Sequence, residues 1–482
     1  MQLKKEAFSG MVWVFIDYFL VKGVSFVGSI VLARLLMPSD FGIIAMIAIF
    51  MTFGNILLDS GLSSSLIRNN NNDDKDYSTV FFTNVFFGVI IYLFFFLTAP
   101  IIAEFFNQII LINIIRFYSI VFLLTSFSSV QMTVLIKYMQ FKKIAVLNIP
   151  SVILGLGVGV FMAIKDYGVW SIISMYLVNQ LILSLGLWLS SGWKPKFIFS
   201  KNRFLYHFNF GYRLLIANFL SGTTTNIYNA VTGKFYTLNT AGNFERAFTL
   251  NNYPLMVLTQ VIGKVTFPLL SKIQDDKDYL NEIFIKLARF TFFVSAPLMI
   301  ILSASAKPLI LVLLGEKWNE AIPIFQILCL GGIFYTLQAL NVNTIKIYGR
   351  TDYILKGEIF LNIVMIVLSG SALLLGFKVF LWSIVFNSFL RLIVNMFYCS
   401  KVIEITVMQQ LISMFPVFVI ASVTFVIIQL ELNYFENYTN LSDIFKLVFS
   451  LLIGASSYLL LSYIFKISAL LELVKFIKEK YI

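Results

Sequence analysis

The sequence has little charge, one histidine and two cysteines. Lys, Arg, Asp and Glu make up 12% of the 482 residues, and 59% are hydrophobic, whereas soluble domains average about 25% charged residues. This composition excludes a soluble enzyme. His207 alone leaves almost no material for a histidine metal centre or general base, and we expect it to be a solvated loop residue. Cys329 and Cys399 lie in apolar runs, where thiols usually serve as packing residues.

Signals for ATP or nucleic acid are also missing. Gly155, Gly157 and Gly159 lie in an apolar run without the strand, Lys and Ser/Thr of a phosphate-binding loop, so we expect close helix packing through Gly155 and Gly159. The net charge of +12 is scattered through short loops rather than gathered on one basic face. We therefore predict no nucleic-acid partner, no cofactor, no metal and no catalytic residue.

What the sequence has instead is a series of apolar runs of about 20 residues, the length that crosses a bilayer. They lie near 11–36, 41–59, 78–99, 108–136, 144–164, 168–190, 213–233, 246–270, 287–306, 320–341, 354–376, 379–400, 408–430 and 444–465. Pro297 and Pro308 interrupt the run 287–314, which can hold more than one element. The pattern predicts an all-α polytopic membrane protein of about 14 transmembrane helices, with 12 as the alternative count.

The distribution of Lys and Arg predicts the orientation. With the N-terminus in the cytoplasm, most of the 36 Lys and Arg residues lie in or beside inner loops and seven lie outside. An even number of spans then places both termini in the cytoplasm.

An internal repeat divides the chain. Asp-Asp-Lys-Asp-Tyr occurs at 73–77 and at 275–279, and Arg34 and Gly42 pair with Lys234 and Gly242 at an offset of 200 residues. We predict a six-helix lobe at 1–200, a second at 201–405, and a helix pair with a tail at 406–482. The lobes form a parallel repeat about an axis along the membrane normal, with substrate between them. The repeated acidic motif resembles the metal-binding pairs of glycosyltransferases, but a solvated loop in which Asp76 or Ser78 caps the next helix is the better interpretation.

Several charged residues fall inside the apolar runs. A charge at the centre of a membrane helix costs about 2.5–3.5 kcal/mol on insertion scales, so each requires water or a partner. Polar residues flank these charges at helical spacing, as Asn387 and Asn395 flank Arg391, and a further polar face follows Asn218, Ser221, Thr225 and Asn229. The pattern predicts a cationic cavity for an anionic substrate, while mutual pairing that holds helices together is the alternative. The substrate-binding candidates are Lys22, Arg391, Arg116, Lys264, Arg34 and Lys234, and the candidates for proton or ion coupling are Asp17 and Glu358.

Four segments carry a resemblance to a known family. They are Val31-Leu-Ala-Arg34-Leu-Leu-Met-Pro38-Ser-Asp40-Phe-Gly42, Ala241-Gly242-Asn-Phe-Glu-Arg246-Ala247, Val265-Thr-Phe-Pro268-Leu-Leu-Ser271-Lys-Ile-Gln-Asp275-Asp276 and Pro308-Leu-Ile-Leu-Val-Leu-Leu-Gly315-Glu-Lys-Trp318. The chain resembles the Wzx-type bacterial polysaccharide flippases, nearest the colanic-acid and teichuronic-acid exporters, in the superfamily that includes MATE transporters. One departure is Asn243-Phe244, where the family commonly has Tyr after the glycine.

The resemblance implies two six-helix lobes, alternating access, and a lipid-linked oligosaccharide substrate on undecaprenyl pyrophosphate, made for O-antigen, capsule or exopolysaccharide. It implies a bacterial cytoplasmic (inner) membrane protein with membrane lipids around it, and a polysaccharide polymerase and a chain-length regulator as partners. Three other functions remain open from the residues: an ion-coupled drug or small-solute exporter on the same fold, a membrane-bound polysaccharide polymerase, and a purely structural role in a biosynthetic complex, in which the buried charges would have no purpose. The excess of cationic residues argues against the exporter, and the short outer loops argue against the polymerase.

Overall fold

The computed structural model describes residues 2–59, 61–69 and 71–481. Within them, the side chains of 2–12, 15, 59, 213–214, 216–225, 265, 371–372, 473 and 476–481 are not described. Contacts within the chain define two compact units, unit 1 (Met1–Gly242) and unit 2 (Asn243–Ile482), which we describe separately.

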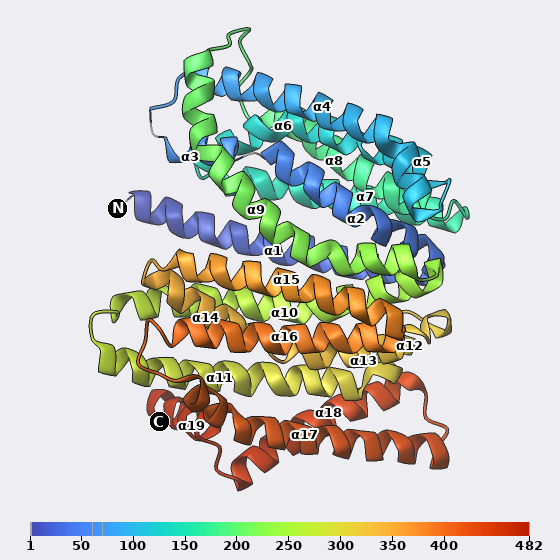
Figure 1. Ribbon diagram of the computed structural model, residues 1–482, viewed down its shortest axis with the longest axis vertical. Helices are drawn as coiled ribbons and strands as arrows, with labels where there is room; N and C mark the ends of the chain where they lie inside the picture. Colours follow the sequence, from blue (N-terminus) through green and yellow to red (C-terminus); the bar gives the residue numbers. More distant parts are fainter. Residues whose placement is uncertain (1, 60, 70, 482) are drawn as a thin grey trace. The chain divides into compact units, whose positions relative to one another are not determined.

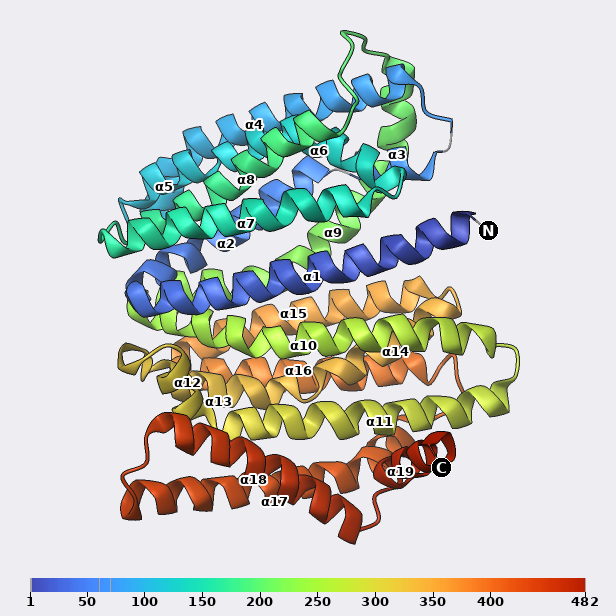
Figure 2. The same ribbon diagram turned by 180° about the vertical axis from the view of Figure 1, so that it is seen from behind.

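Unit 1 is a bundle of helices connected by short loops (Figure 1). Its helices are α1 (Gln2–Leu35), α2 (Pro38–Asp59), α3 (Leu62–Arg68), α4 (Asp74–Phe106), α5 (Leu111–Tyr118), α6 (Ile120–Lys137), α7 (Phe141–Ile164), α8 (Trp170–Ser190) and α9 (Lys201–Phe235), followed by the first turn of α10 (Leu238–Lys272). Helix α7 packs against both α1 and α8, α4 packs against α6, and α9 packs against α2 (Figure 2).

Unit 2 contains the rest of α10 and the remaining helices. These are α11 (Lys277–Ala304), α12 (Ala306–Leu313), a 3-10 turn at Glu316–Trp318, α13 (Ala321–Gly332), α14 (Tyr335–Ile347), α15 (Thr351–Leu375), α16 (Phe377–Cys399), α17 (Val407–Tyr438), α18 (Asp443–Ile464) and α19 (Ser468–Tyr481). The main pairs are α11 with α17, α15 with α16, and α17 with α18.

The helices match the predicted spans closely. Thirteen helical segments among the described residues are long and apolar enough to cross a membrane, so the chain is an all-α multi-pass membrane protein. The predicted run 213–233, inside α9, is not among them, and most of its side chains lie outside the described residues. The fourth span of each predicted half is broken, at Ser119 between α5 and α6 and at Ile333–Phe334 between α13 and α14.

The run 287–314 holds two elements, as its prolines indicated. Helix α11 continues through Pro297 and ends at Ala304, and α12 begins at Ala306 with Pro308 in its first turn. Pro308 fits there because the first turn of a helix needs no backbone N–H donor from it. The matching Pro100 of the first half lies inside the uninterrupted α4.

The two compact units divide the chain at 242/243, whereas the predicted lobes divide it at 200/201. The difference concerns α9, which follows residue 200 in sequence but packs on α2, α3 and α4. The lobes 1–200, 201–405 and 406–482 therefore remain a proposal about the internal repeat rather than a description of compact packing.

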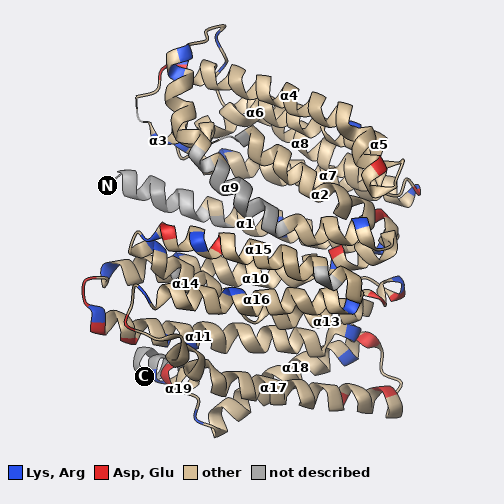
Figure 3. Cartoon of the chain, viewed as in Figure 1, with Lys and Arg blue, Asp and Glu red and all other residues tan. Residues whose placement is uncertain are grey.

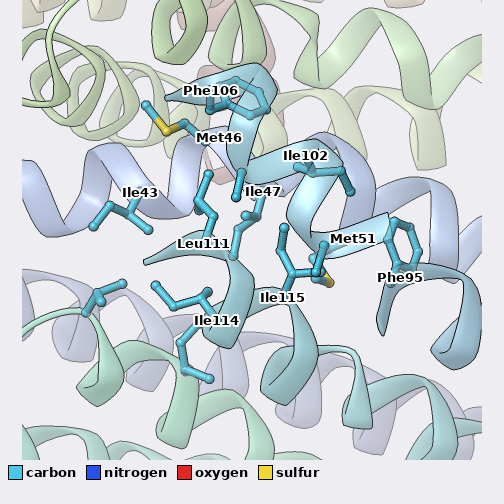
Figure 4. Packing of buried hydrophobic residues seen from close by; sticks show 14 of the residues in the cluster. Ile43, Met46, Ile47, Met51, Phe95, Ile102, Phe106, Leu111, Ile114 and Ile115 are labelled. Carbon is cyan, nitrogen blue, oxygen red and sulfur yellow. The ribbon is translucent and has the colours of Figure 1, made fainter. Parts of the chain in front are cut away.

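A cluster of buried apolar side chains holds α2, α4 and α5 together in unit 1. Ile47, Leu111, Ile114 and Ile115 in this cluster have no exposed surface, and the side chains of α2 and α4 interdigitate with those of α5 (Figure 4). In a bilayer the lipid is as apolar as these side chains, so close van der Waals packing rather than the hydrophobic effect stabilises the cluster.

Small residues bring other helices into close contact. A Cβ atom at Gly155 would lie 2.7 Å from the backbone oxygen of Met175, and one at Gly159 would lie 2.9 Å from the Met175 Cβ. This confirms the predicted packing role of both glycines, which let α7 lie directly against α8. Cys329 and Cys399 are both buried free thiols, as expected for packing residues.

Two repeat-related glycines make the closest backbone contact in unit 1. A Cβ atom at Gly42 would lie 2.2 Å from the Leu238 backbone oxygen, and one at Gly242 would lie 1.7 Å from the Pro38 backbone oxygen. Each glycine thus packs against the first residue of the other's helix, α10 or α2. Only a residue without Cβ fits at either position.

Candidate functional site

Charged residues gather near the helix ends, and few lie along their middle turns (Figure 3). This distribution is what a bilayer requires, because charge is costly in hydrocarbon. The exceptions are therefore the candidate functional residues, and most of those predicted from sequence are described in full.

Asp17 lies on α1 beside α7. Its side chain is half-buried, and the Asn148 side-chain amide donates to both carboxylate oxygens at 3.3 Å each. Asn148 precedes Pro150 inside α7, on the helix that packs along α1. The polar pair gives Asp17 one neutral partner and no basic partner among the described residues.

Lys22 lies further along α1 and, unlike Asp17, has no partner among the residues that the structure describes. Its side chain is exposed, and it makes no hydrogen bond, ion pair or ring contact with any described residue. It is 13 residues from the helix end at Leu35, or about 20 Å at 1.5 Å per residue. Lys22 is thus a cation deep inside a predicted membrane span, and no described residue pairs with it.

In unit 2, Arg391 of α16 pairs with Glu358 of α15. The Arg391 Nη1 atom lies 2.5 Å from the Glu358 Oε1 atom, and the side chains are 17% and 33% exposed. The pairing alternative considered from the sequence therefore applies to Arg391. The pair is incomplete, however, because the Arg391 Nη2 atom is buried and has no hydrogen-bond partner among the described residues. One guanidinium donor remains available to an anion.

Among the candidates predicted from sequence, Lys264 of α10 is the second exposed cation without a partner among the described residues. It is eight residues from the end of α10 at Lys272, or about 12 Å. Gln260, one helical turn earlier, is also exposed, so the predicted polar stripe exists on this helix.

The other three cationic candidates lie in the last turns of their helices, α5, α9 and α1. The Arg116 Nε donates to the Phe96 backbone oxygen at 3.3 Å, and its guanidinium lies 4.5 Å from the Phe96 ring centre. Lys234 donates to the Phe105 backbone oxygen and lies 4.4 Å from that ring. Arg34 is exposed in the last turn of α1. Arg116 and Lys234 thus hold α5 and α9 to α4.

The predicted polar face of the seventh span is only partly described. Asn218, Ser221 and Thr225 lie outside the described side chains, and Asn229 is buried. Asn226, which the sequence analysis did not single out, donates to the Thr52 hydroxyl of α2 at 3.0 Å. Polar contacts therefore join α9 to α2 within unit 1.

The prediction that His207 is a solvated loop residue is wrong. His207 is fully buried in α9, where its Nδ1 lies 2.8 Å from the Ser65 hydroxyl and its Nε2 lies 3.1 Å from the Asp76 Oδ1. Asp76 is also fully buried, and Arg203 lies 3.5 Å from it. Burial lowers the pKa of His207, which fits a neutral ring that accepts from Ser65 and donates to Asp76. The spacing of four residues between Arg203 and His207 was the only sequence signal for this cluster.

The sequence predicted that Asp76 or Ser78 caps the helix after the first acidic motif, and this position is wrong by three or more residues. Asp73 is the N-cap of α4, and it exchanges hydrogen bonds with Asp76 at the third helical position in a capping box. The backbone N–H of Asp76 is the main cause that lowers the pKa of Asp73. In the second copy the N-cap is Asp276, which accepts from the Tyr279 N–H at 3.1 Å.

The sequence analysis missed one further intramembrane acid. Both carboxylate oxygens of Glu431 on α17 are buried and without a hydrogen-bond partner among the described residues. The predicted span ended at 430, whereas α17 continues to Tyr438, so Glu431 was assigned to a loop. Glu431 was missed because the predicted span ends too early.

Known proteins resemble the chain in sequence. It is 25% identical to the lipopolysaccharide biosynthesis protein WzxC of Escherichia coli (strain K12) over 362 residues, 75% of this chain and 74% of WzxC. It is 24% identical to the teichuronic acid biosynthesis protein TuaB of Bacillus subtilis (strain 168), over 73% of each chain.

Solved structures resemble it in fold. The lipid II flippase MurJ in an inward closed conformation matches 94% of this chain and 98% of its own, with a TM-score of 0.77 at 15% identity. A multidrug resistance MATE family transporter of the MOP superfamily, in an inward-facing conformation, covers 81% of this chain and 97% of its own with a TM-score of 0.61 at 14% identity. Residues 31–323 match the polysaccharide biosynthesis protein family, and the chain therefore belongs to that family.

Proposed function

We propose that this protein is a flippase for lipid-linked oligosaccharides. It carries repeat units on undecaprenyl pyrophosphate from the cytoplasmic to the outer leaflet of the bacterial inner membrane, for O-antigen, capsule or exopolysaccharide synthesis. Family membership, the names of WzxC and TuaB, and the fold likeness to a lipid II flippase support the proposal. No covalent bond changes in this process, so the protein acts as a transporter and not as an enzyme.

The observation that carries the proposal is Lys22, exposed and without a partner among the described residues, about 20 Å from the end of α1. A lysine this deep is stable only in contact with water or an anion. A water-filled cavity that receives a diphosphate head group supplies both. Lys264 of α10, also exposed and without a described partner, is a second cation of the proposed site.

Arg391 and Glu358 form the adjustable part of the proposed site. Glu358 neutralises Arg391 across 2.5 Å, while the Arg391 Nη2 donor has no partner among the described residues. A phosphate oxygen that accepts from this donor competes with Glu358 for the guanidinium. Glu358, once displaced, is then free to take up a proton or cation, and Asp17 is the corresponding acid in unit 1.

Alternating access follows from the proposal. With both termini in the cytoplasm, the contact between Gly42 and Gly242 lies at the outer ends of α2 and α10, and it keeps these ends together. Substrate enters from the cytoplasmic side, and separation of the two glycines releases it outward. The polymerase and the chain-length regulator act on the released product.

The test is complementation in a strain that lacks the gene. K22A should abolish surface polysaccharide while the protein reaches normal membrane abundance. The matched control is K165A, since Lys165 is an exposed lysine at the end of α7 without a described partner. Normal polysaccharide export by both K22A and K264A would contradict the proposed cationic site. If the strain that lacks the gene is more sensitive to cationic drugs but makes normal surface polysaccharide, the result would favour a drug exporter instead.

A further inference from the structure

We propose that unit 2 contains a binding site for the head group of an anionic phospholipid, separate from the residues assigned to transport. The site is a cavity of about 570 Å³ formed by α11, α17, the segment between α16 and α17, and the first residue of α19. Arg289, Asn281, Gln409, Glu404 and Ile412 are among its lining residues.

Arg289 is the cation of this cavity. It is half-buried, and it makes no hydrogen bond or ion pair with any described residue. It lies 12 residues after the start of α11 at Lys277 and 15 before its end at Ala304, about 18 and 22 Å along the helix. In a hydrocarbon layer of about 30 Å, this depth lets a long arginine side chain reach the phosphates of one leaflet. An arginine there requires an anion.

The acidic groups nearby do not supply that anion. Glu404, which also lines the cavity, lies 3.4 Å from Lys277 in an ion pair. Glu282 on α11 lies 2.5 Å from Lys286. Glu472 of α19, the third acid near this face, also acts on Lys286. None of these three carboxylates has a described contact with Arg289, so its positive charge remains for a ligand.

The polar lining favours a ligand with hydroxyl groups as well as a phosphate. The Asn281 Oδ1 atom is buried and has no hydrogen-bond partner among the described residues. Because it is an acceptor, a ligand must supply a donor to it. The Gln409 Oε1 atom already accepts from the Thr406 N–H at 2.8 Å, which leaves its amide N–H groups to donate to a phosphate. A phosphoglycerol head group offers both a phosphate and hydroxyl donors.

The surface beside the cavity favours acyl chains. Met408, Ile412 and Phe415 of α17 are 64%, 62% and 65% exposed, and their spacing of four and three residues places them on one helix face. Such a face on a membrane span lies in lipid. A ligand in the cavity thus has an apolar surface for its tails next to the polar groups, which a free phosphate ester would not use.

Helix α19 adds an interfacial element at the same place. Ser468, which lines the cavity, begins this helix. Its sequence has apolar residues at 470, 473, 474 and 477, lysines at 475, 478 and 480, and acidic residues at 472 and 479. This pattern is typical of an amphipathic helix at a membrane surface, here with an excess of one positive charge. Lysines at this surface attract anionic lipids.

Native mass spectrometry of the full-length purified protein tests the site, with phosphatidylglycerol and phosphatidylcholine as the two lipid probes. Wild type and K165Q, whose lysine lies at the end of α7 in unit 1 and has no described partner, should bind phosphatidylglycerol equally and in preference to phosphatidylcholine. The affinity of R289Q for phosphatidylglycerol should fall by about tenfold or more, since this variant loses a charge-assisted hydrogen bond. R289K keeps the charge and should retain most of the binding, which separates loss of charge from misfolding.

Two results would overturn this proposal without affecting the flippase. The first is equal phosphatidylglycerol binding by wild type and R289Q. The second is that glycerol 3-phosphate alone binds as strongly as phosphatidylglycerol and depends on Arg289, because the ligand would then be a soluble phosphate ester. Normal polysaccharide export by R289Q, together with lost lipid binding, would support a lipid site that is separate from transport.

Discussion

Gly42 and Gly242, 200 residues apart in the chain, lie in contact, with the Gly42 N–H nitrogen 3.0 Å from the position of a Cβ at Gly242. Both follow the start of a helix by four residues, Pro38 of α2 and Leu238 of α10. Two positions that the predicted repeat pairs thus lie in contact within unit 1. The contact is specific because backbone atoms, which cannot rotate away, form both sides of it.

A methyl group at Gly242 should therefore separate the two helix starts. G242A would place Cβ 1.7 Å from the Pro38 oxygen, and overpacking of this kind costs at least about 1–3 kcal/mol. We expect a lower thermal unfolding temperature of the purified protein and reduced polysaccharide export. The matched control is G157A, because a Cβ at Gly157 of α7 has no neighbour within 4 Å. Equal unfolding temperatures for the two variants would contradict the contact.

The pair of Arg391 and Glu358 should show energetic coupling. Single variants R391Q and E358Q each leave a partly buried charge without its partner, whereas the double variant leaves none. A double-mutant cycle of the free energy of unfolding should give a coupling of about 0.5–3 kcal/mol. The more exposed, single contact between Lys277 and Glu404 serves as the control and should show little or no coupling. Additive effects of R391Q and E358Q would mean that the two side chains act independently.

His207 should make stability depend on pH. It lies before the predicted span of α9, and burial lowers its pKa in the folded protein, so the folded state binds fewer protons than the unfolded state, in which the pKa is about 6.5. Its stabilising effect should be complete above about pH 6.5 and decline as the pH falls below that value. Asp76, Arg203 and Lys137 all act on this group.

The unfolding temperature measured from pH 8 to pH 5 checks this prediction. In H207N the decline below pH 6.5 should be smaller than in wild type, because Asn does not titrate while it still offers a donor and an acceptor. Superimposable pH profiles for the two proteins would show that His207 does not cause the dependence.

Glu431 should be dispensable as a charge. Its two buried oxygens have no partner among the described residues, and a buried carboxylate without a partner is costly. E431Q keeps the shape without the charge, so its unfolding temperature should equal or exceed that of wild type. E431K should lower it, since Lys is larger and always needs solvation. A marked loss of stability in E431Q would instead mean that the carboxylate has a partner in the native membrane.

The sequence predicted the spans because apolar runs of about 20 residues need no knowledge of their neighbours. The sequence also showed that Asp17, Lys22, Arg391 and Glu358 are charged residues inside apolar runs, where charge is easily recognised. Contacts between distant segments could not be predicted. Gly42 and Gly242 were marks of a repeat with no indication that they touch, and the partners of His207 come from α3 and α4, which only tertiary packing brings to α9.

The ends of helices also could not be predicted accurately from the sequence. Glu431 escaped notice because α17 extends past the run 408–430, and hydropathy alone does not locate the end of a helix. The pairing of Arg391 with Glu358 was one of two alternatives from the sequence, and the geometry favoured it while leaving one donor of Arg391 unused.

The most direct test of the account is transport by the purified protein in proteoliposomes that contain an undecaprenyl-pyrophosphate-linked oligosaccharide labelled in the inner leaflet. An impermeant reagent that reacts with the sugar reports its arrival in the outer leaflet. Wild type and K165A should expose the sugar to the reagent, whereas K22A and empty liposomes should not. Failure of wild type to expose more sugar than empty liposomes, under each ion gradient supplied, would contradict the flippase function.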